Sequence, residues 1–323
     1  MRAVVRDRYG SPDVLRLAKV PKPSPGEGEV LVRVRAASAN AGDWRILRAA
    51  PFLIRLGGYG LLTPKHPILG QDVAGQVAAL GAGVTQFREG DEVFGESPDC
   101  GGFAEYVRVP AARLAPKPAS LSFEQAAAVP MAGVTALRGL RLAGPLQPGQ
   151  AVLVNGASGG VGMFAVQIAK ALGAEVTGVC STLNGELVRS IGADRVIDYT
   201  REDFTRNEQA YDLILDAAAY RSIFDCRRAL RPGGTYVHIG GSTARMFEVL
   251  LLAPLASRGR NGAFRFLASE TTTEDLVVLT ELLEAGKVAP VIDRRYPLSG
   301  VADALRYLET GRARGKVVID VAA

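Results

Sequence analysis

Cysteine and histidine are scarce in this sequence. Among 323 residues there are three cysteines, Cys100, Cys180 and Cys226, and two histidines. A catalytic zinc needs three protein ligands, and a structural zinc usually has four, typically clustered thiolates. Residues so few and so far apart cannot supply either kind of site. The odd number of scattered cysteines also indicates free thiols in a reducing compartment rather than a disulfide framework.

Blocks of like charge and long apolar runs are lacking as well. The 38 Lys and Arg residues exceed the 33 Asp and Glu residues only slightly and are spread along the chain, so we expect no nucleic-acid partner. No charge-free apolar run approaches the roughly 20 residues that a membrane span needs. The N-terminus enters an apolar strand at residues 3–5 without a basic leader. These features predict a cytoplasmic protein without membrane association.

What remains is the composition of a globular enzyme. Hydrophobic residues make up 48% and charged residues 22% of the chain, which is enough to build a buried core. A length of 323 residues exceeds the usual size of a single core, so we expect two domains. Both histidines have structural interpretations, because His66 lies in a loop between a lysine and a proline and His238 ends a strand. A Ser-His-Asp hydrolase is therefore not expected.

Residues 151–180, AVLVNGASGGVGMFAVQIAKALGAEVTGVC, have the pattern of a strand, a glycine turn, a helix and a second strand. A helix N-terminus favours an anion, and glycines before it let a phosphate approach the backbone. The pattern therefore predicts a dinucleotide site. The run G-A-S-G-G-V-G departs from the strict G-x-G-x-x-G, so a purely structural glycine turn is the alternative.

The predicted secondary structure of the chain changes near Ser120. Short strands and turns precede it, which predicts a mostly β domain. Ser122 and Gln125 then form a capping-box start for an alanine-rich helical region that runs towards Leu142. We place the domain boundary at this change.

Strands and helices alternate after the glycine turn. We expect strands at residues 176–180, 195–199, 212–216 and 235–240. This alternation predicts an α/β fold with a parallel, doubly wound sheet, which binds its ligand beyond the C-terminal ends of the strands. The last segment, residues 291–321, has a strand, a helix and a strand that fit either domain.

Seven segments distributed over nearly the whole chain form a specific set. They are DRYGSPDVLRL, AASANAGDWRILR, LGQDVAGQVAALGAGVTQFREGDEVFG, GGFAEYVRVP, NGASGGVG, GADRVIDYT and ARGKVVI. Together they resemble the medium-chain dehydrogenase/reductase superfamily, in particular its zinc-free, quinone-oxidoreductase-like branch. The resemblance implies a GroES-like, mostly β substrate domain at residues 1–120, completed by residues 291–323, and a Rossmann dinucleotide domain at residues 121–290. It also implies hydride transfer from NADPH to a small molecule, and often a homodimer.

The zinc ligands of the wider superfamily are replaced in this chain. Zinc-dependent relatives have a cysteine where Asn40 stands and Gly-His-Glu where Gly70, Gln71 and Asp72 stand. Without a Lewis acid to hold an alkoxide, the substrate must disperse the charge itself, as a quinone or an α,β-unsaturated carbonyl does. We therefore expect a zinc-independent quinone or enone reductase with no metal site.

Two residues are catalytic candidates. Asn40 matches the active-site asparagine of the resembling family and could bond the acceptor oxygen, although a loop asparagine that satisfies its own backbone is the alternative. Tyr59, in L-G-G-Y-G, could line the pocket or donate a proton, or it could be an exposed loop tyrosine. Trp44 and Ile46 are expected to pack beneath the loop.

The predicted cofactor-binding residues follow the ends of the expected strands. They are Thr135, Ser158, Gly159, Gly160, Val161, Gly162, Ser181, Thr182, Tyr199 and Gly240. Thr135 resembles a residue at the nicotinamide end, or it simply bonds a carbonyl one helical turn back. The second strand ends without a carboxylate, which favours NADPH over NADH. Related sequences have an arginine where this chain has Leu183, so the preference should be modest and NADH stays open.

Two other functions remain as alternatives. A reductase of simple aldehydes and alcohols would turn over saturated substrates. A dinucleotide-binding protein without catalysis would keep the NGASGGVG turn beside a substrate pocket that bulky groups fill, and Trp44, Phe52 and Tyr59 leave this open. The natural substrate does not follow from the fold, because loops build the pocket.

Overall fold

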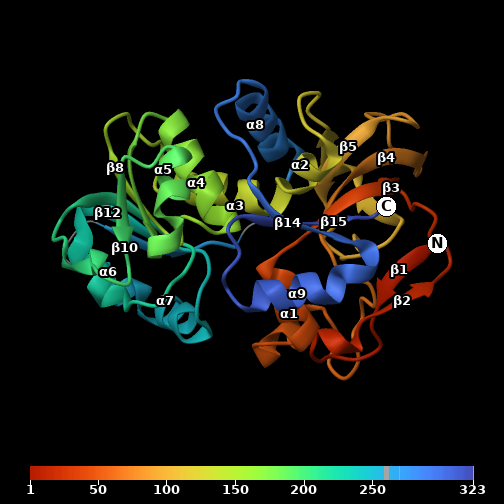
Figure 1. Cartoon of the computed structure of the whole chain (residues 1–323), viewed down its shortest axis with the longest axis horizontal. Helices are drawn as coiled ribbons and strands as arrows, with labels where there is room; N and C mark the ends of the chain where they lie inside the picture. The colour runs from red at the N-terminus through yellow and green to blue at the C-terminus, as the bar shows by residue number, and fades with distance from the viewer. Residues whose placement is uncertain (258–261, 269, 323) are drawn as a thin grey trace. The chain divides into compact units, whose positions relative to one another are not determined.

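The computed structural model describes residues 1–257, 262–268 and 270–322 and divides into two compact units (Figure 1). Unit 1 comprises Met1–Met131, Thr271–Glu284 and Pro290–Ala323, and unit 2 comprises Ala132–Glu270 and Ala285–Ala289. Within the described ranges, no helix is both long and apolar enough to span a bilayer.

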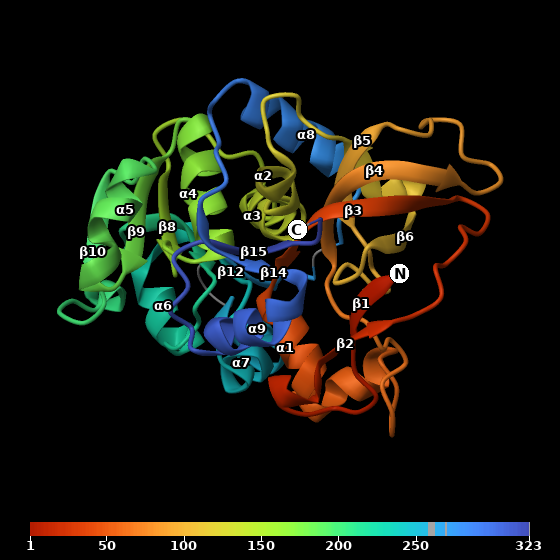
Figure 2. The same cartoon turned by 45° about the vertical axis from the view of Figure 1, so that its right-hand side comes forward.

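Unit 1 is built around a seven-stranded sheet with the order β14-β15-β3-β4-β5-β7, in which β6 also pairs with β3. Its strands are β3 (Glu29–Ala39), β4 (Asp72–Leu80), β5 (Glu92–Glu96), β6 (Tyr106–Pro110), β7 (Leu114–Pro116), β14 (Ile292–Pro297) and β15 (Lys316–Asp320), beside the two-stranded sheet β1 (Arg2–Val5) and β2 (Arg16–Lys19). Its helices are α1 (Ala41–Arg48), α2 (Phe123–Ala127), α8 (Thr273–Glu284) and α9 (Val301–Glu309). Helix α9 lies against α1, as Figure 2 shows.

The C-terminal segment completes the sheet of unit 1. Strand β15 runs antiparallel to β3, with Val317 opposite Ala39, and β3 pairs with β4, with Ser38 opposite Asp72. The family resemblance implies that the last residues complete the substrate domain, and in the structure Pro290–Ala323 lie in unit 1. The strand pairing also brings the start of β15 and the start of β4 to the end of β3.

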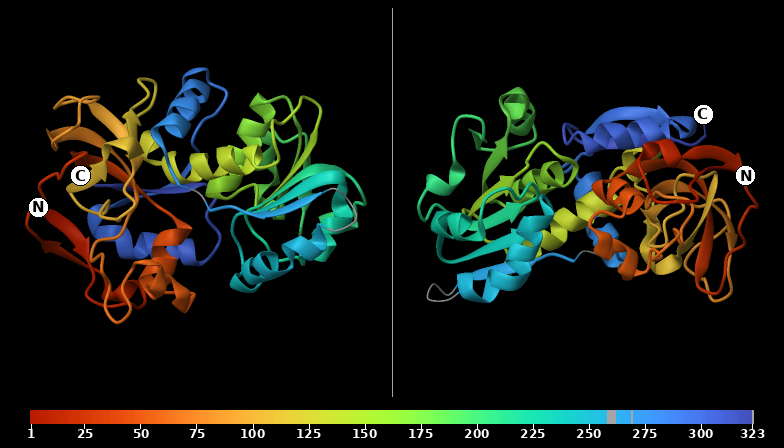
Figure 3. Two further views of the ribbon diagram at one scale, coloured as in Figure 1. Left: turned by 180° about the vertical axis from the view of Figure 1, so that it is seen from behind. Right: turned by 90° about the horizontal axis from the view of Figure 1, so that it is seen from below.

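Unit 2 contains a six-stranded parallel sheet with the order β10-β9-β8-β11-β12-β13. Its strands are β8 (Ala151–Asn155), β9 (Glu175–Cys180), β10 (Arg195–Asp198), β11 (Tyr211–Asp216), β12 (Leu230–His238) and β13 (Ala263–Phe266). Its helices are α3 (Pro130–Arg141), α4 (Gly160–Ala171), α5 (Gly185–Ser190), α6 (Ile223–Ala229) and α7 (Thr243–Ala256). Helices α4 and α5 cover one face of the sheet, and α6 and α7 cover the other (Figure 3). The predicted doubly wound sheet is confirmed.

The division between the units differs from the boundary expected at Ser120. Helix α2 packs on β3 and β4, and α8 packs on β7, so both helices belong with the β-rich unit. The helical region expected towards Leu142 is interrupted as well. Helix α2 ends at Ala127 and α3 begins at Pro130, because proline is tolerated in the first turn of a helix but not in its interior.

Candidate functional site

The glycine turn joins β8 to α4 at the C-terminal edge of the sheet. The N–H of Met163 donates to the carbonyl of Gly159 at 3.0 Å, which begins the ladder of α4. The N–H groups of Gly160, Val161 and Gly162 precede this bond, so they face the end of the helix as donors. Together with the helix dipole they form a site for an anion.

The structure requires glycine at some positions of this turn and not at others. Gly156 has φ of +81°, and a Cβ on Gly162 would lie 2.1 Å from the carbonyl oxygen of Gly156. The turn itself therefore requires both residues. A Cβ on Gly159 would meet that oxygen at 3.4 Å, an ordinary contact. The protein alone does not require glycine at residue 159, which leaves the approach of a ligand as a reason for it.

Polar side chains flank this turn from the end of β9. The amide of Asn184 donates to the hydroxyl of Ser158 at 3.0 Å. The Oδ1 atom of Asn184 is buried and has no hydrogen-bond partner among the described residues. A buried amide oxygen of this kind is normally satisfied, so a polar ligand group fits here. The turn and Asn184 together suit a dinucleotide.

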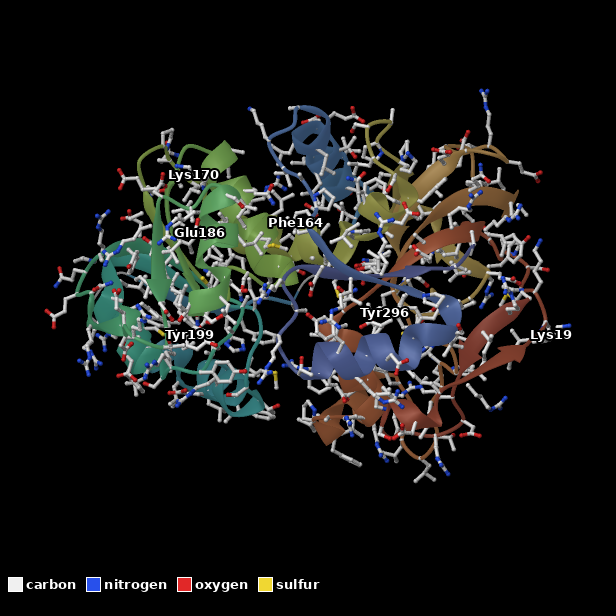
Figure 4. The ribbon with its side chains drawn as sticks, viewed as in Figure 1. Lys19, Phe164, Lys170, Glu186, Tyr199 and Tyr296 are labelled. Atoms are coloured by element: carbon white, nitrogen blue, oxygen red, sulfur yellow. The ribbon has the colours of Figure 1, made fainter. Side chains whose placement is uncertain are left out.

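Ser181, Thr182 and Tyr199 lie together where β9 and β10 end. The hydroxyl of Thr182 donates to Oδ2 of Asp198 at 2.5 Å, and the N–H of Tyr199 donates to the carbonyl of Cys180 at 3.1 Å. The ring of Tyr199, labelled in Figure 4, is 60% exposed. The structure thus places the carboxylate of Asp198 beside Thr182 and Tyr199, two of the predicted cofactor-binding residues.

A buried carboxylate joins the central strands of unit 2 at the same edge. Asp216, at the end of β11, accepts from Asn155 of β8 at 2.8 Å and from the hydroxyl of Tyr236 of β12 at 2.8 Å. Burial raises the pKa of Asp216 to about 6. Gly240 follows β12, and its N–H donates to the carbonyl of Asp216 at 3.3 Å. Asp216 therefore fixes the strand ends that carry the glycine turn.

Two further residues of unit 2 that the sequence analysis singled out, Thr135 and His238, are buried. Thr135 is buried in α3. A Cβ on Gly139, one turn later, would touch Leu215, Ile239 and Leu267, so α3 packs closely against β11 and the segments that follow β12 and β13. His238 is buried and stacks on Phe266 with ring centroids 5.7 Å apart, which agrees with its structural interpretation.

In unit 1, Asn40 belongs to a buried polar cluster. The ammonium of Lys316 donates to Oδ1 of Asn40 at 2.5 Å and to Oδ2 of Asp72 at 3.2 Å, and the amide nitrogen of Asn40 donates to the same Asp72 oxygen at 2.9 Å. Only 3% of Lys316 is exposed and none of Asp72. The register of β15, β3 and β4 brings these three residues together.

Further donors complete the environment of Asp72. The hydroxyl of Ser38 donates to Oδ2 at 3.0 Å, and the N–H of Met131 donates to Oδ1 at 2.9 Å. Because an ammonium can only donate, the oxygen of the Asn40 amide must face Lys316 and its nitrogen must face Asp72. The second amide hydrogen of Asn40 has only a long contact, 3.5 Å, to the carbonyl of Ser38.

Asp43 holds the segment that follows Asn40. Its carboxylate accepts from the N–H of Asn40 at 2.7 Å and from the N–H of Gly70 at 3.1 Å, which caps α1 and fixes the neighbouring loop. Burial raises the pKa of Asp43 to about 7. Asp43 is thus a buried support for the backbone of Asn40.

Tyr59 is half-buried and packs its ring against the core of unit 1. It meets His66 edge-on at 5.8 Å, and the hydroxyl of Tyr9 donates to its carbonyl at 2.6 Å. Burial raises the pKa of Tyr59 to about 12. Nearby, Ile46 is buried in the core, whereas Trp44 is half-buried.

The donor set around Asn40 and Asp72 does not fit a zinc ion. The two oxygens that would face a metal already accept from the ammonium of Lys316, and a second cation there would be repelled at short range. In the part of the chain that the structure describes, no three His, Cys, Asp or Glu residues are grouped to hold a metal.

Sequence reasoning missed Lys316, Asp43, Asp198 and Asp216. Lys316 alone has a visible signal, because it opens the apolar run of β15 and a charged residue in such a run needs a partner. The roles of Asp43, Asp198 and Asp216 depend on strand register or helix capping, which is seen only in the structure. Among the predicted residues, the structure groups Ser158 to Gly162 in one turn and Ser181, Thr182 and Tyr199 at another.

Comparisons with known proteins cover both units. The model of the alcohol dehydrogenase GroES-like domain matches residues 26–119, and that of the zinc-binding dehydrogenase family matches residues 191–319. The 2-methylene-furan-3-one reductase of Solanum lycopersicum is 38% identical over 333 residues, covering 99% of this chain and 79% of the relative. The NADPH-dependent alkenal/one oxidoreductase of Arabidopsis thaliana chloroplasts is 36% identical over 272 residues, covering 80% and 64%.

A solved structure agrees with these relatives. The quinone oxidoreductase from Coxiella burnetii superposes with a TM-score of 0.88 at 31% identity, covering 99% of each chain. The fold, the glycine turn and these similarities over nearly the full length lead to one assignment. The chain belongs to the medium-chain dehydrogenase/reductase superfamily.

Proposed function

We propose that this chain is a zinc-independent, NADPH-dependent oxidoreductase that transfers hydride to a quinone or an α,β-unsaturated carbonyl. The observation that carries the proposal is the cluster of Lys316, Asn40 and Asp72, in which an ammonium bonds the side chains at two positions that match metal-site positions of the zinc-dependent family members. Without a Lewis acid, an acceptor that delocalises the incoming charge is favoured. The similar 2-methylene-furan-3-one reductase from Solanum lycopersicum and quinone oxidoreductase from Coxiella burnetii support the same substrate classes.

The chain's own residues would bind and orient rather than perform covalent chemistry. The bound nicotinamide supplies the hydride. The N–H groups that begin α4 would hold the pyrophosphate, and Thr135 and Gly240 would lie along the cofactor. Asn40 would present its second amide hydrogen to the acceptor oxygen, while Lys316 and Asp72 fix the orientation of its amide. Tyr59 would form a wall of the substrate pocket.

A substrate scan tests this proposal. NADPH oxidation should be fast with quinones and enones and slow with saturated aldehydes of similar size. Preferred turnover of saturated aldehydes or alcohols would favour the first alternative function. Tight NADPH binding without turnover of any of these classes would favour a dinucleotide-binding protein without catalysis.

Purified protein is expected to contain far less than one zinc per chain. The reason is that Lys316 occupies the oxygens of Asn40 and Asp72 that a metal would need. Elemental analysis measures the content, and prolonged chelation should leave quinone reduction unchanged. A stoichiometric zinc whose removal abolishes activity would contradict the proposal.

Tyr59→Phe is expected to keep quinone reduction within about threefold of the parent rate. Burial raises the pKa of Tyr59 to about 12, which makes it a poor acid, and water readily protonates a quinol anion. Steady-state kinetics give the comparison. Tyr9→Phe, which removes the hydroxyl bonded to the carbonyl of Tyr59, serves as the control for loop position. A drop in kcat of about 10² to 10⁴, typical of a lost general acid, would instead make Tyr59 catalytic.

Two further properties belong to the proposal. A homodimer is supported by the edge strand β13 and by the exposed side chains of Leu250, Leu251 and Leu255 on α7 of the same unit. The cytoplasm is proposed as the location, because its reducing conditions suit three buried free thiols.

A further inference from the structure

The adenosine end of the cofactor site lacks a carboxylate on β9. In dinucleotide-binding folds an Asp or Glu at the end of the second strand bonds the ribose hydroxyls of NADH. Strand β9 ends at Cys180, and Ser181, Thr182 and the exposed Leu183 follow. Judged from this strand alone, nothing would repel the 2′-phosphate of NADPH.

The neighbouring strand supplies the missing carboxylate. Asp198 is the last residue of β10, and the parallel register places it directly beside Cys180. It reaches across to Thr182, whose hydroxyl donates to its Oδ2 at 2.5 Å. The carboxylate therefore lies where the adenosine ribose is expected, although it comes from the third strand of the unit.

The hydroxyl hydrogens of Thr182 and Thr200 are already used in bonds to Asp198. The hydroxyl and the N–H of Thr200 donate to Oδ1 of Asp198 at 2.7 Å and 3.0 Å, while Thr182 donates to Oδ2. A hydroxyl has one hydrogen and two lone pairs. Both threonines therefore present only lone pairs to a ligand. Acceptors suit the ribose diol, which can donate, and do not suit a phosphate dianion.

The negative charge at the subsite also disfavours the 2′-phosphate of NADPH. Hydrogen bonds from Thr182 and then Thr200 lower the pKa of Asp198, so the carboxylate is ionised at neutral pH. Arg201 lies 3.7 Å from Oδ2 of Asp198, and its side chain is 74% exposed. Arg189 is paired with Glu186 at 2.9 Å. One exposed arginine thus offsets the carboxylate only partly.

We propose that Asp198 is the specificity-determining residue of the cofactor site: it accepts from the adenosine ribose and opposes the 2′-phosphate, so that NADH binds nearly as well as NADPH. The inference rests on the proposed function, because it requires the site to bind a dinucleotide. It gives a second physical reason, besides Leu183, to expect only a modest preference for NADPH in this chain.

Asp198→Asn tests the inference, because it keeps the shape and one acceptor oxygen but removes the charge. Isothermal titration of the purified chain with NADPH, NADH, 2′,5′-ADP and 5′-ADP measures binding without turnover. NADPH and 2′,5′-ADP should bind about tenfold more tightly than to the parent, and NADH and 5′-ADP somewhat less tightly. Asp225→Asn removes an exposed carboxylate of the same unit and should change none of the four.

Thr182→Val provides a second measurement that does not depend on the folding of the first variant. Its hydroxyl hydrogen bonds Asp198, so its loss should weaken NADH and leave NADPH affinity unchanged. Weaker NADPH binding in either variant would overturn the inference. Weaker NADPH binding in Thr182→Val would mean that the Thr182 hydroxyl bonds the 2′-phosphate. In Asp198→Asn it would mean that Asp198 positions Arg201 to bind that phosphate. Unchanged affinities in Asp198→Asn would overturn it too. A parent chain that binds none of the four ligands would instead remove the proposed function, and the inference with it.

Discussion

Gly160→Val is expected to raise the dissociation constant of NADPH by at least about a hundredfold while unit 2 stays folded. Gly160 is the first residue of α4, where a branched side chain would stand between the helix N–H groups and the pyrophosphate. Two charge-assisted hydrogen bonds of about 1.5 to 3 kcal/mol each correspond to roughly this loss or more. Titration of NADPH, followed by fluorescence, measures it.

Gly162→Ala separates binding from folding in the same turn. A Cβ at residue 162 would lie 2.1 Å from the carbonyl oxygen of Gly156, so even alanine should lower the thermal stability of unit 2. Gly160→Val should leave the circular dichroism and the melting temperature close to those of the parent. An unchanged NADPH affinity in Gly160→Val would mean that the turn is structural only.

The glycine turn is predictable from the sequence because its signal is local. The strand, the turn and the helix follow one another between residues 151 and 171, and their periodicities need no partner from elsewhere. The exact role of each glycine is not local. The carbonyl of Gly156 leaves no room for a Cβ on Gly162, whereas Gly159 has room for one, and only the folded turn distinguishes the two residues.

The cluster around Asn40 cannot be predicted in the same way. Lys316 bonds Asn40 across a sequence separation of 276 residues, and only the antiparallel register of β15 on β3 makes them neighbours. Shifting that register by one residue would turn Lys316 to the opposite face. Asp198 similarly acts on Thr182 through the pairing of β10 with β9.

The division between the two units differs from the boundary expected at Ser120 for a related reason. The sequence pattern changes at Ser120 from predicted strands to predicted helices, but tertiary packing decides which unit a helix belongs to. Helix α8 follows the Rossmann segment in the chain, yet it packs on β7 of unit 1. Its amphipathic pattern predicts a helix and contains nothing about the sheet that it covers.

Lys316→Met is expected to lower the unfolding free energy of unit 1 by about 3 to 5 kcal/mol. The substitution keeps the volume of the side chain but leaves Asp72 as a buried charge whose cation is gone. Trp44, the only tryptophan, lies on α1 of the same unit, so its fluorescence during urea denaturation reports on unit 1. Arg2→Met, which breaks the exposed pair with Glu105 in the same unit, should cost less than about 1 kcal/mol.

The double variant Lys316→Met/Asp72→Asn distinguishes charge from packing. If the loss comes from an unpaired carboxylate, neutralising Asp72 should recover at least half of it, because Ser38 and Asn40 can still bond an amide at residue 72. If the loss comes from packing of the lysine stem, the double variant should be no more stable than Lys316→Met. A loss below about 1 kcal/mol in the single variant would mean that water reaches the cluster and solvates Asp72. Lys316 would then not be the buried cation that fixes the orientation of the Asn40 amide.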